Sequence, residues 1–296
     1  MKCFYHSADL DGKCSAAIVR RKYPNCELIG INYGQPFPWD DIGEGETVFM
    51  VDFSLQPFED MIQLESMCKL LWIDHHKSAI NEAHAAGFLA YEQTLEDGTG
   101  ACILTWLHLF PDDAVPYAVQ LLGEYDVWDH HDPDCLPFQY GMGAEDGSPD
   151  SGIWSALLST DHKTSECAVE EVASTGRIIL DYQAKQNAGH AKTLCFDSEL
   201  DGLKLLAANA GPINSKFFDS RWDADKYDAM CLFQWRPKGN SWTVSLYSDR
   251  DDVDVSEVCK ARGGGGHKGA AGFQCAELPF GLCARLAEPT SKGDES

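Results

Sequence analysis

The sequence predicts an α/β fold, in which a parallel-sheet domain is joined by a helical linker to a smaller α+β domain. Strand-like and helix-like segments alternate over the first two-thirds of the chain, which is typical of βαβ units. A long polar stretch at 166–192 has few turn residues, and a second group of strand-like segments follows it. The length of 296 residues agrees with about two domains.

Short runs rich in β-branched and aromatic residues predict the strands of the first domain. In chain order they fall at residues 2–5, 26–32, 47–53 and 69–73. Apolar residues at helical spacing predict helices at residues 13–22, 58–68, 101–110, 114–128 and 153–158. We interpret the Asp11-Gly12 pair as a turn between the first strand and the first helix.

The second half of the chain predicts one long helix, followed by a mixed domain. The helix at 166–192 carries the chain from one domain to the next. Further strands are expected at 203–208, 230–235 and 242–248, with helical pieces at 215–221 and 255–262. We therefore place the first domain at 1–185, a helical linker region at 186–199, the second domain at 200–286 and a disordered tail at 287–296.

Charge is the strongest global constraint on the partners of this protein. Lys and Arg total 23 and Asp and Glu total 47, which gives a net charge of −24. So acidic a surface repels the phosphates of long DNA or RNA. Small anionic substrates remain compatible with it if metal ions or a basic segment reverse the charge locally.

Composition also constrains where the protein is expected to work. No apolar run reaches the roughly 18 residues needed to span a bilayer, and the first residues lack the apolar core of a secretory signal. The 12 cysteines form no CxxC pair, which disfavours a zinc ribbon or a thioredoxin-type site. We expect a cytoplasmic protein with reduced thiols and no membrane partner.

Acidic and imidazole side chains follow several predicted strands. The carboxyl ends of parallel strands share one edge of a sheet, where ligands commonly bind. These candidates are His6, Asp9, Asp11, Asp52, Asp74, His75 and His76. Taken singly, such residues are equally typical of turns, helix caps or an exposed histidine pair. Oxygen and imidazole donors without thiolates suit Mn²⁺ or Mg²⁺, and their number exceeds the needs of one ion, which favours a two-metal site.

A further acidic cluster at 124–132 follows a predicted helix. One of its aspartates could complete the metal site, and the alternatives are Asp126 and Asp129. We favour Asp126 because we expect it to be buried in register with Tyr125 and Trp128.

A run of four glycines, 263–266, lies in the stretch 258–273, which carries three basic residues and His267 and contains no acid. Glycines let backbone N–H groups approach a ligand closely, and we expect the following residues to open a helix whose N-terminus favours anions. Arg262, His267 and Lys268 add positive charge. The segment therefore predicts phosphate binding, and a flexible linker is the alternative.

In combination these motifs resemble those of the DHH/DHHA1 phosphoesterases. The resemblance spans nearly the whole chain and rests on His6-Ser-Ala-Asp9-Leu-Asp11, Val51-Asp52, Asp74-His75-His76 and the glycine run with His267 and the Ala-Ala-Gly that follows. The family includes RecJ-like exonucleases, short-oligonucleotide hydrolases, nucleoside-bisphosphate phosphatases and cyclic-dinucleotide phosphodiesterases. The resemblance implies a DHH catalytic domain followed by a DHHA1 substrate-binding domain.

The resemblance also implies a role for each site residue. Two Mn²⁺ ions, with Mg²⁺ or another divalent ion as the alternative, would be held by His6, Asp9, Asp11, Asp52, His75 and Asp126, with Asp52 bridging. The catalytic residues would be His76, which contacts the phosphate, and Asp74. The substrate's terminal phosphate would be bound by Arg262, Gly264, Gly265, Gly266 and His267, with Asn214 as a weaker candidate.

The expected activity is manganese-dependent hydrolysis of short oligonucleotides or small, linear or cyclic, nucleotides to mononucleotides, by water that two metal ions activate. A phosphomonoesterase or pyrophosphatase acting on nucleoside bisphosphates or polyphosphate is the alternative. A nucleotide-binding sensor without catalysis is a third hypothesis. The oligomeric state stays open, with a homodimer packed on the helical region 101–128 as one option.

Overall fold

The computed structural model describes residues 1–281, and its chain divides into two compact units. Unit 1 is Met1–Leu180, and unit 2 begins at Asp181. Helix α8, His162–Leu194, runs across this boundary, so the expected linker at 186–199 corresponds to the end of α8 and most of strand β6. The expected tail at 287–296 and positions 282–286 lie outside the described residues. Among residues 1–281, no helix combines the length and hydrophobicity needed to cross a bilayer.

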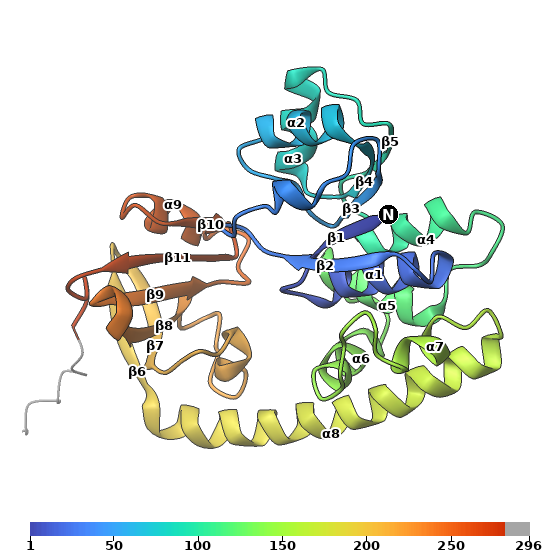
Figure 1. The fold of residues 1–296 in the computed structure, drawn as a ribbon. Helices are drawn as coiled ribbons and strands as arrows, with labels where there is room; N and C mark the ends of the chain where they lie inside the picture. The colour runs from blue at the N-terminus through green and yellow to red at the C-terminus, as the bar shows by residue number, and fades with distance from the viewer. Residues whose placement is uncertain (282–296) are drawn as a thin grey trace, which may run out of the picture. The chain divides into compact units, whose positions relative to one another are not determined.

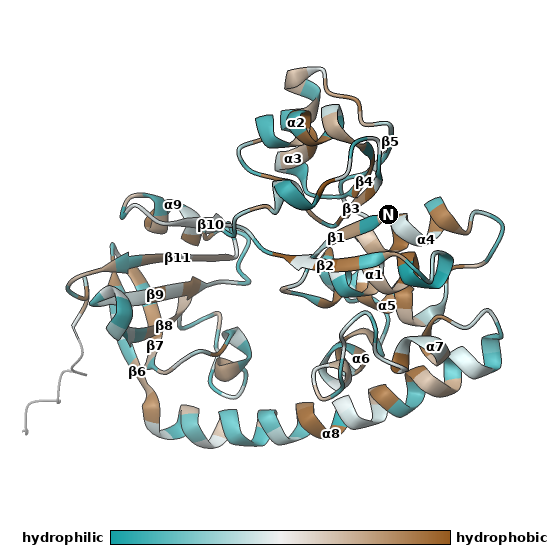
Figure 2. Cartoon of the chain, viewed as in Figure 1, coloured by the Kyte–Doolittle hydropathy of each residue, from teal (hydrophilic) through white to brown (hydrophobic). Residues whose placement is uncertain are grey.

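Unit 1 is built on a five-stranded parallel sheet with strand order β2-β1-β3-β4-β5, as the alternation of strands and helices predicts (Figure 1). Its strands are β1 Lys2–His6, β2 Glu27–Ile31, β3 Thr47–Val51, β4 Lys69–Asp74 and β5 Glu92–Leu95. Strand β5 is not among the predicted strands because its Glu-Gln-Thr-Leu sequence is short and mostly polar. The central strands β3 and β4 are hydrophobic, as strands covered on both faces require (Figure 2).

Helices cover both faces of this sheet and bury two separate cores (Figure 1). The helices of unit 1 before α8 are α1 Leu10–Lys22, α2 Glu59–Met67, α3 Lys77–Ala86, α4 Ala101–Leu109, α5 Tyr117–Asp126, α6 Cys135–Met142 and α7 Ile153–Leu157, with a 3-10 turn η1 at Trp39–Asp41. Helices α1, α4 and α5 pack with Phe49 and Ile73 on one face. Helices α2 and α3 pack with Met50 and Trp72 on the other. Helices α3 and α6 are absent from the sequence prediction.

Helix α1 starts earlier than predicted, and the Asp11-Gly12 pair lies inside its first turn rather than in a turn before it. The Asp9 side chain accepts a hydrogen bond from Gly12 N at 3.0 Å and so caps the helix. A Cβ on Gly12 would overlap the carbonyl oxygen of His6. Glycine is therefore needed here because the helix begins in direct contact with the end of β1.

Unit 2 contains a six-stranded mixed sheet with strand order β10-β11-β9-β8-β7-β6. Its strands are β6 Cys195–Leu200, β7 Leu203–Asn209, β8 Ala229–Arg236, β9 Ser241–Tyr247, β10 Gly265–His267 and β11 Ala270–Cys275. Strands β7 and β8 are parallel, and the other described neighbours are antiparallel. Helix α9 spans Val255–Lys260, and 3-10 turns occupy η2 Ser215–Phe218 and η3 Pro237–Gly239. The helix expected at 215–221 is therefore only the short turn η2.

The residues after the glycine run also differ from the prediction. They form the antiparallel hairpin β10–β11 instead of opening a helix. The pairing of Gly266 with Ala271 and of His267 with Ala270 accounts for the Ala-Ala sequence as part of a strand. The expectation of an anion site at a helix N-terminus in this segment is therefore wrong.

The first half of α8 docks on α6 through two glycines. A Cβ on Gly176 would overlap the carbonyl oxygen of Pro137, and one on Gly141 would overlap that of Val172. The backbones of the two helices are thus in direct contact, an arrangement that larger side chains cannot enter without displacing one helix.

Gly176→Ala should therefore destabilise the protein by about 1–3 kcal/mol, because the added methyl group overpacks this contact. Gly189→Ala in the same helix is the matched control, since no atom lies within 4 Å of the point that its Cβ would occupy. That change should stabilise the helix by about 0.5–1 kcal/mol through helix propensity alone. Thermal unfolding of both variants measures the difference, and equal midpoints would contradict the packing described here.

Candidate metal centre

The candidate site lies at the carboxyl edge of the parallel sheet of unit 1, where the strand order reverses. In the order β2-β1-β3-β4-β5, the chain passes from β1 to β2 on one side, and then from β3 to β4 and β5 on the opposite side. Such a switch point leaves a crevice at the carboxyl ends of the two strands, the usual ligand position in open α/β sheets. His6 ends β1, and Asp52 comes directly after β3.

Three groups of donor atoms converge here, and within each group the atoms lie within 4.8 Å of one another. The groups are His6, Asp9 and Asp52; Asp52, His75 and His76; and Asp11, His75 and Asp126. Asp52 and His75 each belong to two groups, so the seven residues form one continuous cluster. The structure thus brings together all six residues expected to hold metal, with His76 beside them.

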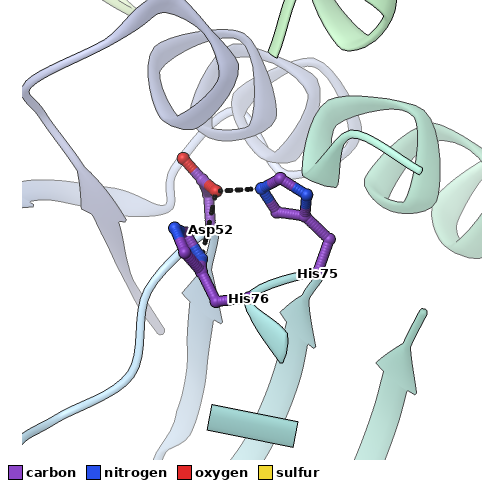
Figure 3. A group of neighbouring side chains, drawn as sticks. All are labelled: Asp52, His75 and His76. Carbon is purple, nitrogen blue, oxygen red and sulfur yellow. Dashed lines mark ion pairs between the residues drawn. The ribbon is translucent and has the colours of Figure 1, made fainter. Parts of the chain in front are cut away.

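Asp52 is the centre of the cluster. Its side chain is almost fully buried and points between the two histidines that follow β4, as Figure 3 shows. Oδ1 of Asp52 lies 3.3 Å from His75 Nε2 and 3.8 Å from His76 Nδ1. Its backbone has φ of +55°, a left-handed conformation that costs a non-glycine residue about 1–2 kcal/mol.

Two of the aspartates also hold helix N-termini. Asp9 uses Oδ1 to cap α1, while its Oδ2 lies 2.8 Å from His6 Nδ1. Asp11 accepts hydrogen bonds from the backbone N–H groups of Ala101 and Cys102 at 2.7 and 2.8 Å. The first turn of α4 is therefore anchored on Asp11. Asp9 can both cap α1 and belong to the cluster, because it uses a different carboxylate oxygen for each role.

Asp74 lies behind the cluster and is not a member of any of the three groups. Its Oδ1 accepts hydrogen bonds from the backbone N–H groups of His75 and His76, and it lies 2.7 Å from His76 Nδ1. The side chain is fully buried. This geometry orients both histidines, so Asp74 is a positioning residue of the kind that fixes imidazole ligands from behind.

The structure separates the two alternatives in the acidic cluster. Oδ2 of Asp126 lies 3.1 Å from His75 Nε2, whereas Asp129 pairs with His131. The reason given for choosing Asp126 is nevertheless wrong, because Trp128 is 74% exposed and the Asp126 side chain remains 27% exposed. Asp126 reaches the cluster because it is the last residue of α5, not because it is buried with aromatic neighbours.

The donor set fits divalent cations. Several buried atoms of the cluster make ion-pair contacts with one another but no hydrogen bond of good geometry among the described residues: His6 Nδ1, both carboxylate oxygens of Asp52 and His75 Nε2. Unpaired buried polar atoms are costly, and here most of them face one another. Burial, with the nearby charges of Asp52 and Asp126, holds the pKa of Asp11 well above its usual range, and burial also raises the pKa of Asp52. A divalent cation would relieve both costs.

The histidines of the cluster are strong bases in the protein without metal. Asp52 and Asp9 raise the pKa of His6 to about 10. Burial lowers the pKa of His75, but Asp126 and Asp52 outweigh it and raise that pKa to about 11. Asp74 raises the pKa of His76. Protons therefore occupy the positions that metal ions would take.

The predicted phosphate-binding residues all lie in unit 2. Arg262 donates to both carboxylate oxygens of Asp201, at 2.7 and 2.8 Å, so its guanidinium already has an anionic partner. Asn214 caps η2, with its Oδ1 accepting from Lys216 N at 3.1 Å. Both side chains therefore already have a structural role within unit 2.

The glycine run has a structural explanation in the hairpin. A Cβ on Gly264 would overlap the carbonyl oxygen of Gly272, and Gly266 has φ of +139°. At Gly265, by contrast, a Cβ would meet no atom within 4 Å, and the side chain of His267 is exposed. Gly265 and His267 are thus open to a ligand, as is Gly263 at the start of the run.

Two aromatic residues beside His6 are absent from the predicted site. The ring centroids of Tyr33 and Phe53 lie 5.7 and 5.9 Å from that of His6. Both residues follow strands directly or nearly so, after β2 and after β3, which is the same signal that identified the acidic residues. The prediction missed them because aromatic side chains after a strand are typical of an ordinary hydrophobic core.

Comparisons with known proteins bear on the fold. No family model matches the sequence. An uncharacterized protein of Acanthamoeba polyphaga mimivirus is 24% identical over 233 residues, which cover 77% of this chain and 53% of that protein, so the chain spans about half the length of this relative. A pGpG-specific phosphodiesterase from Vibrio cholerae superposes with a TM-score of 0.53 at 12% identity, over 93% of each chain. The exonuclease RecJ bound to manganese gives 0.45 at 14% identity, over 92% of this chain and 84% of that one.

The similarity to the Vibrio cholerae structure shows a shared fold. The α/β architecture with a five-stranded parallel sheet is consistent with the expected DHH-type fold. Fold and site together define the class of this protein: an open α/β protein with a carboxylate and imidazole cluster, suited to divalent cations, at its switch point.

Binding of Mn²⁺ should release protons. At about pH 7.5 the raised pKa values keep His6 and His75 protonated, and both must lose a proton to bind metal, so we expect release of up to about two protons per protein. Because these pKa values are raised, affinity should grow with pH from about 6.5 towards 10. Calorimetric titration in buffers of different ionisation enthalpy measures the number of protons released. Binding of Mn²⁺ without proton release would contradict the protonation described.

Asp126→Asn should weaken Mn²⁺ binding by about ten-fold or more, because it removes a charged donor next to His75. Asp129→Asn is the matched control three residues away, and it should leave the affinity unchanged because its carboxylate pairs with His131. Equilibrium dialysis of both variants against Mn²⁺ decides between them. A loss in the Asp129 variant alone would reverse the assignment.

Proposed function

We propose that this protein is a divalent-metal-dependent phosphoesterase of the DHH/DHHA1 type, with Mn²⁺ as its favoured cation. The observation that carries the proposal is the convergence of three carboxylates and three imidazoles around Asp52 at the switch point of the sheet. The orphaned buried donors support a role for cations there. The fold shared with a pGpG-specific phosphodiesterase supports phosphate esters as the substrate class.

In this proposal, divalent cations held by the cluster supply the charge that neutralises a phosphoryl group and activates water. The chain itself contributes fixed geometry. Asp52 and His75 tie the donor groups together, and Asp74 holds the ring of His76 through Nδ1. Asp74 raises the pKa of His76 and so favours the imidazolium form, in which the other ring nitrogen also carries a proton that can be donated to a phosphoryl oxygen. His76 is accordingly the proposed catalytic residue and Asp74 its positioning residue.

The proposed substrates are short oligonucleotides or small nucleotides. A net charge of −24 disfavours long nucleic acids, whereas a short substrate needs only a local reversal of charge at the metal centre. In unit 2, His267 and the open backbone at Gly265 are the proposed contacts for a terminal phosphate, and Arg262 joins them only by exchanging Asp201 for that phosphate.

The test is hydrolysis with Mn²⁺ of a small panel: a 5′-phosphorylated dinucleotide, a cyclic dinucleotide, a nucleoside 3′,5′-bisphosphate and polyphosphate. We expect nucleoside monophosphates from the dinucleotide. Asp52→Asn should reduce the rate at least about 100-fold, because it removes the charge that the donor groups share.

Asp129→Asn serves as the control with an unchanged rate. Free phosphate from the bisphosphate or polyphosphate alone would replace the proposal with a phosphomonoesterase or pyrophosphatase. Full activity of Asp52→Asn would remove the cluster from the chemistry altogether.

A further inference from the structure

A cavity of about 320 Å³ lies in unit 1 beside the metal centre, between the segment after β2 and the segment after β3. This volume is within the range of small-molecule sites. The residues that line it are Ile31, Asn32, Tyr33, Gly34, Gln35, Pro36, Phe37, Trp39, Phe53, Leu55, Gln56 and Asp60. None of them belongs to the donor groups of the candidate metal centre.

The wall of this cavity is in contact with the metal centre through His6. Tyr33 and Phe53 pack against each other with centroids 4.5 Å apart, and both lie within 6 Å of the His6 ring. His6 in turn belongs to a donor group with Asp9 and Asp52. A ligand in the cavity would therefore be separated from a group bound at the metal centre by about one side chain.

The chemistry of the lining selects a planar, uncharged group. Four aromatic rings contribute to the cavity, and the exposed ring of Tyr33 offers a stacking surface. Polar contacts are available from the amides of Asn32 and Gln56, side chains of the type that reads the hydrogen-bonding edges of bases. The amide NH2 of Gln35 can add to them, while its Oε1 already accepts from Asn32 N at 3.1 Å. The Oδ1 atom of Asn32 is buried and has no hydrogen-bond partner among the described residues.

The same lining disfavours a phosphate chain. No lysine or arginine lines the cavity in the described part of the chain, and its one charged group is the carboxylate of Asp60. An anion placed there would be desolvated without a counter-charge. The cavity and the metal centre thus suit two different parts of one molecule, an aromatic heterocycle and a phosphate.

We propose that this cavity binds the nucleobase of the substrate, stacked on Tyr33, while the adjacent phosphate lies at the metal centre. This proposal rests on the proposed phosphoesterase function and narrows it to substrates that carry a base. Inorganic polyphosphate and pyrophosphate would leave the cavity empty. Tyr33 is then a specificity-determining residue, which acts on binding of the base rather than on the phosphorus.

The test compares two ligands in the presence of Mn²⁺, adenosine 5′-monophosphate and ribose 5-phosphate, which differ by the base. Calorimetry should show at least about ten-fold tighter binding of the nucleotide by the wild-type protein, the size expected for one stacked base. Tyr33→Leu should abolish this preference, and Tyr33→Phe should retain it because the ring remains. Tyr33 is 43% exposed, so these substitutions do not disturb a core.

Tyr91→Leu is the matched control, since Tyr91 is a similarly exposed tyrosine of unit 1 that does not line the cavity. It should keep the wild-type preference. Equal affinity of the wild-type protein for the two ligands, or an unchanged preference in Tyr33→Leu, would overturn the proposal. Because the readout is binding, it is independent of hydrolysis: a base preference without turnover of any substrate would retain the base site and reject the phosphoesterase.

Discussion

The crowding of carboxylates around Asp52 is the constraint on which the rest of unit 1 depends. Four acidic side chains lie close to three imidazoles, and the burial of Asp11 and Asp52 makes the repulsion between these two stronger than it would be in water. In the described part of the chain, the ion pairs of these four aspartates are all with histidines and none is with a lysine or arginine. The positive charge that the cluster needs must therefore come from protons on the histidines or from bound cations. The raised pKa values of His6 and His75 are the signature of the first solution.

The framework around the cluster reduces this repulsion without removing the demand for cations. Asp9 and Asp11 face the N-terminal turns of α1 and α4, whose backbone N–H groups stabilise negative charge. These contacts fix the position of each carboxylate but add no full positive charge. Asp74 does the same for the two histidines, because its Oδ1 holds their backbone and one ring nitrogen. A preorganised site of this kind binds ions with little rearrangement.

Much of this arrangement could be predicted from the sequence because parallel strands deliver their carboxyl ends to one edge. That rule placed His6, Asp52 and His75 together without knowledge of any distance. Asp126 was beyond the rule, since it ends a helix and its contact with His75 depends on how α5 packs. The glycine run was misread for a different reason. Gly264 allows a neighbouring strand to approach, at Gly272. The sequence alone does not distinguish such a glycine from one that allows a ligand to approach.

The aromatic residues beside the cluster add a second, uncharged surface to the site. In the proposed function the metal centre binds a phosphoryl group, which esters, anhydrides and polyphosphate share, so this contact alone does not select among them. Recognition of a base requires a different surface, with rings for stacking and amides for hydrogen bonds. The cavity bordered by Tyr33 and Phe53 has these properties, and its contact with His6 places it at the same edge of the sheet. In the two proposals together, chemistry and selectivity belong to adjacent surfaces, one charged and one aromatic, so that a substitution in one should alter its function while leaving the other intact.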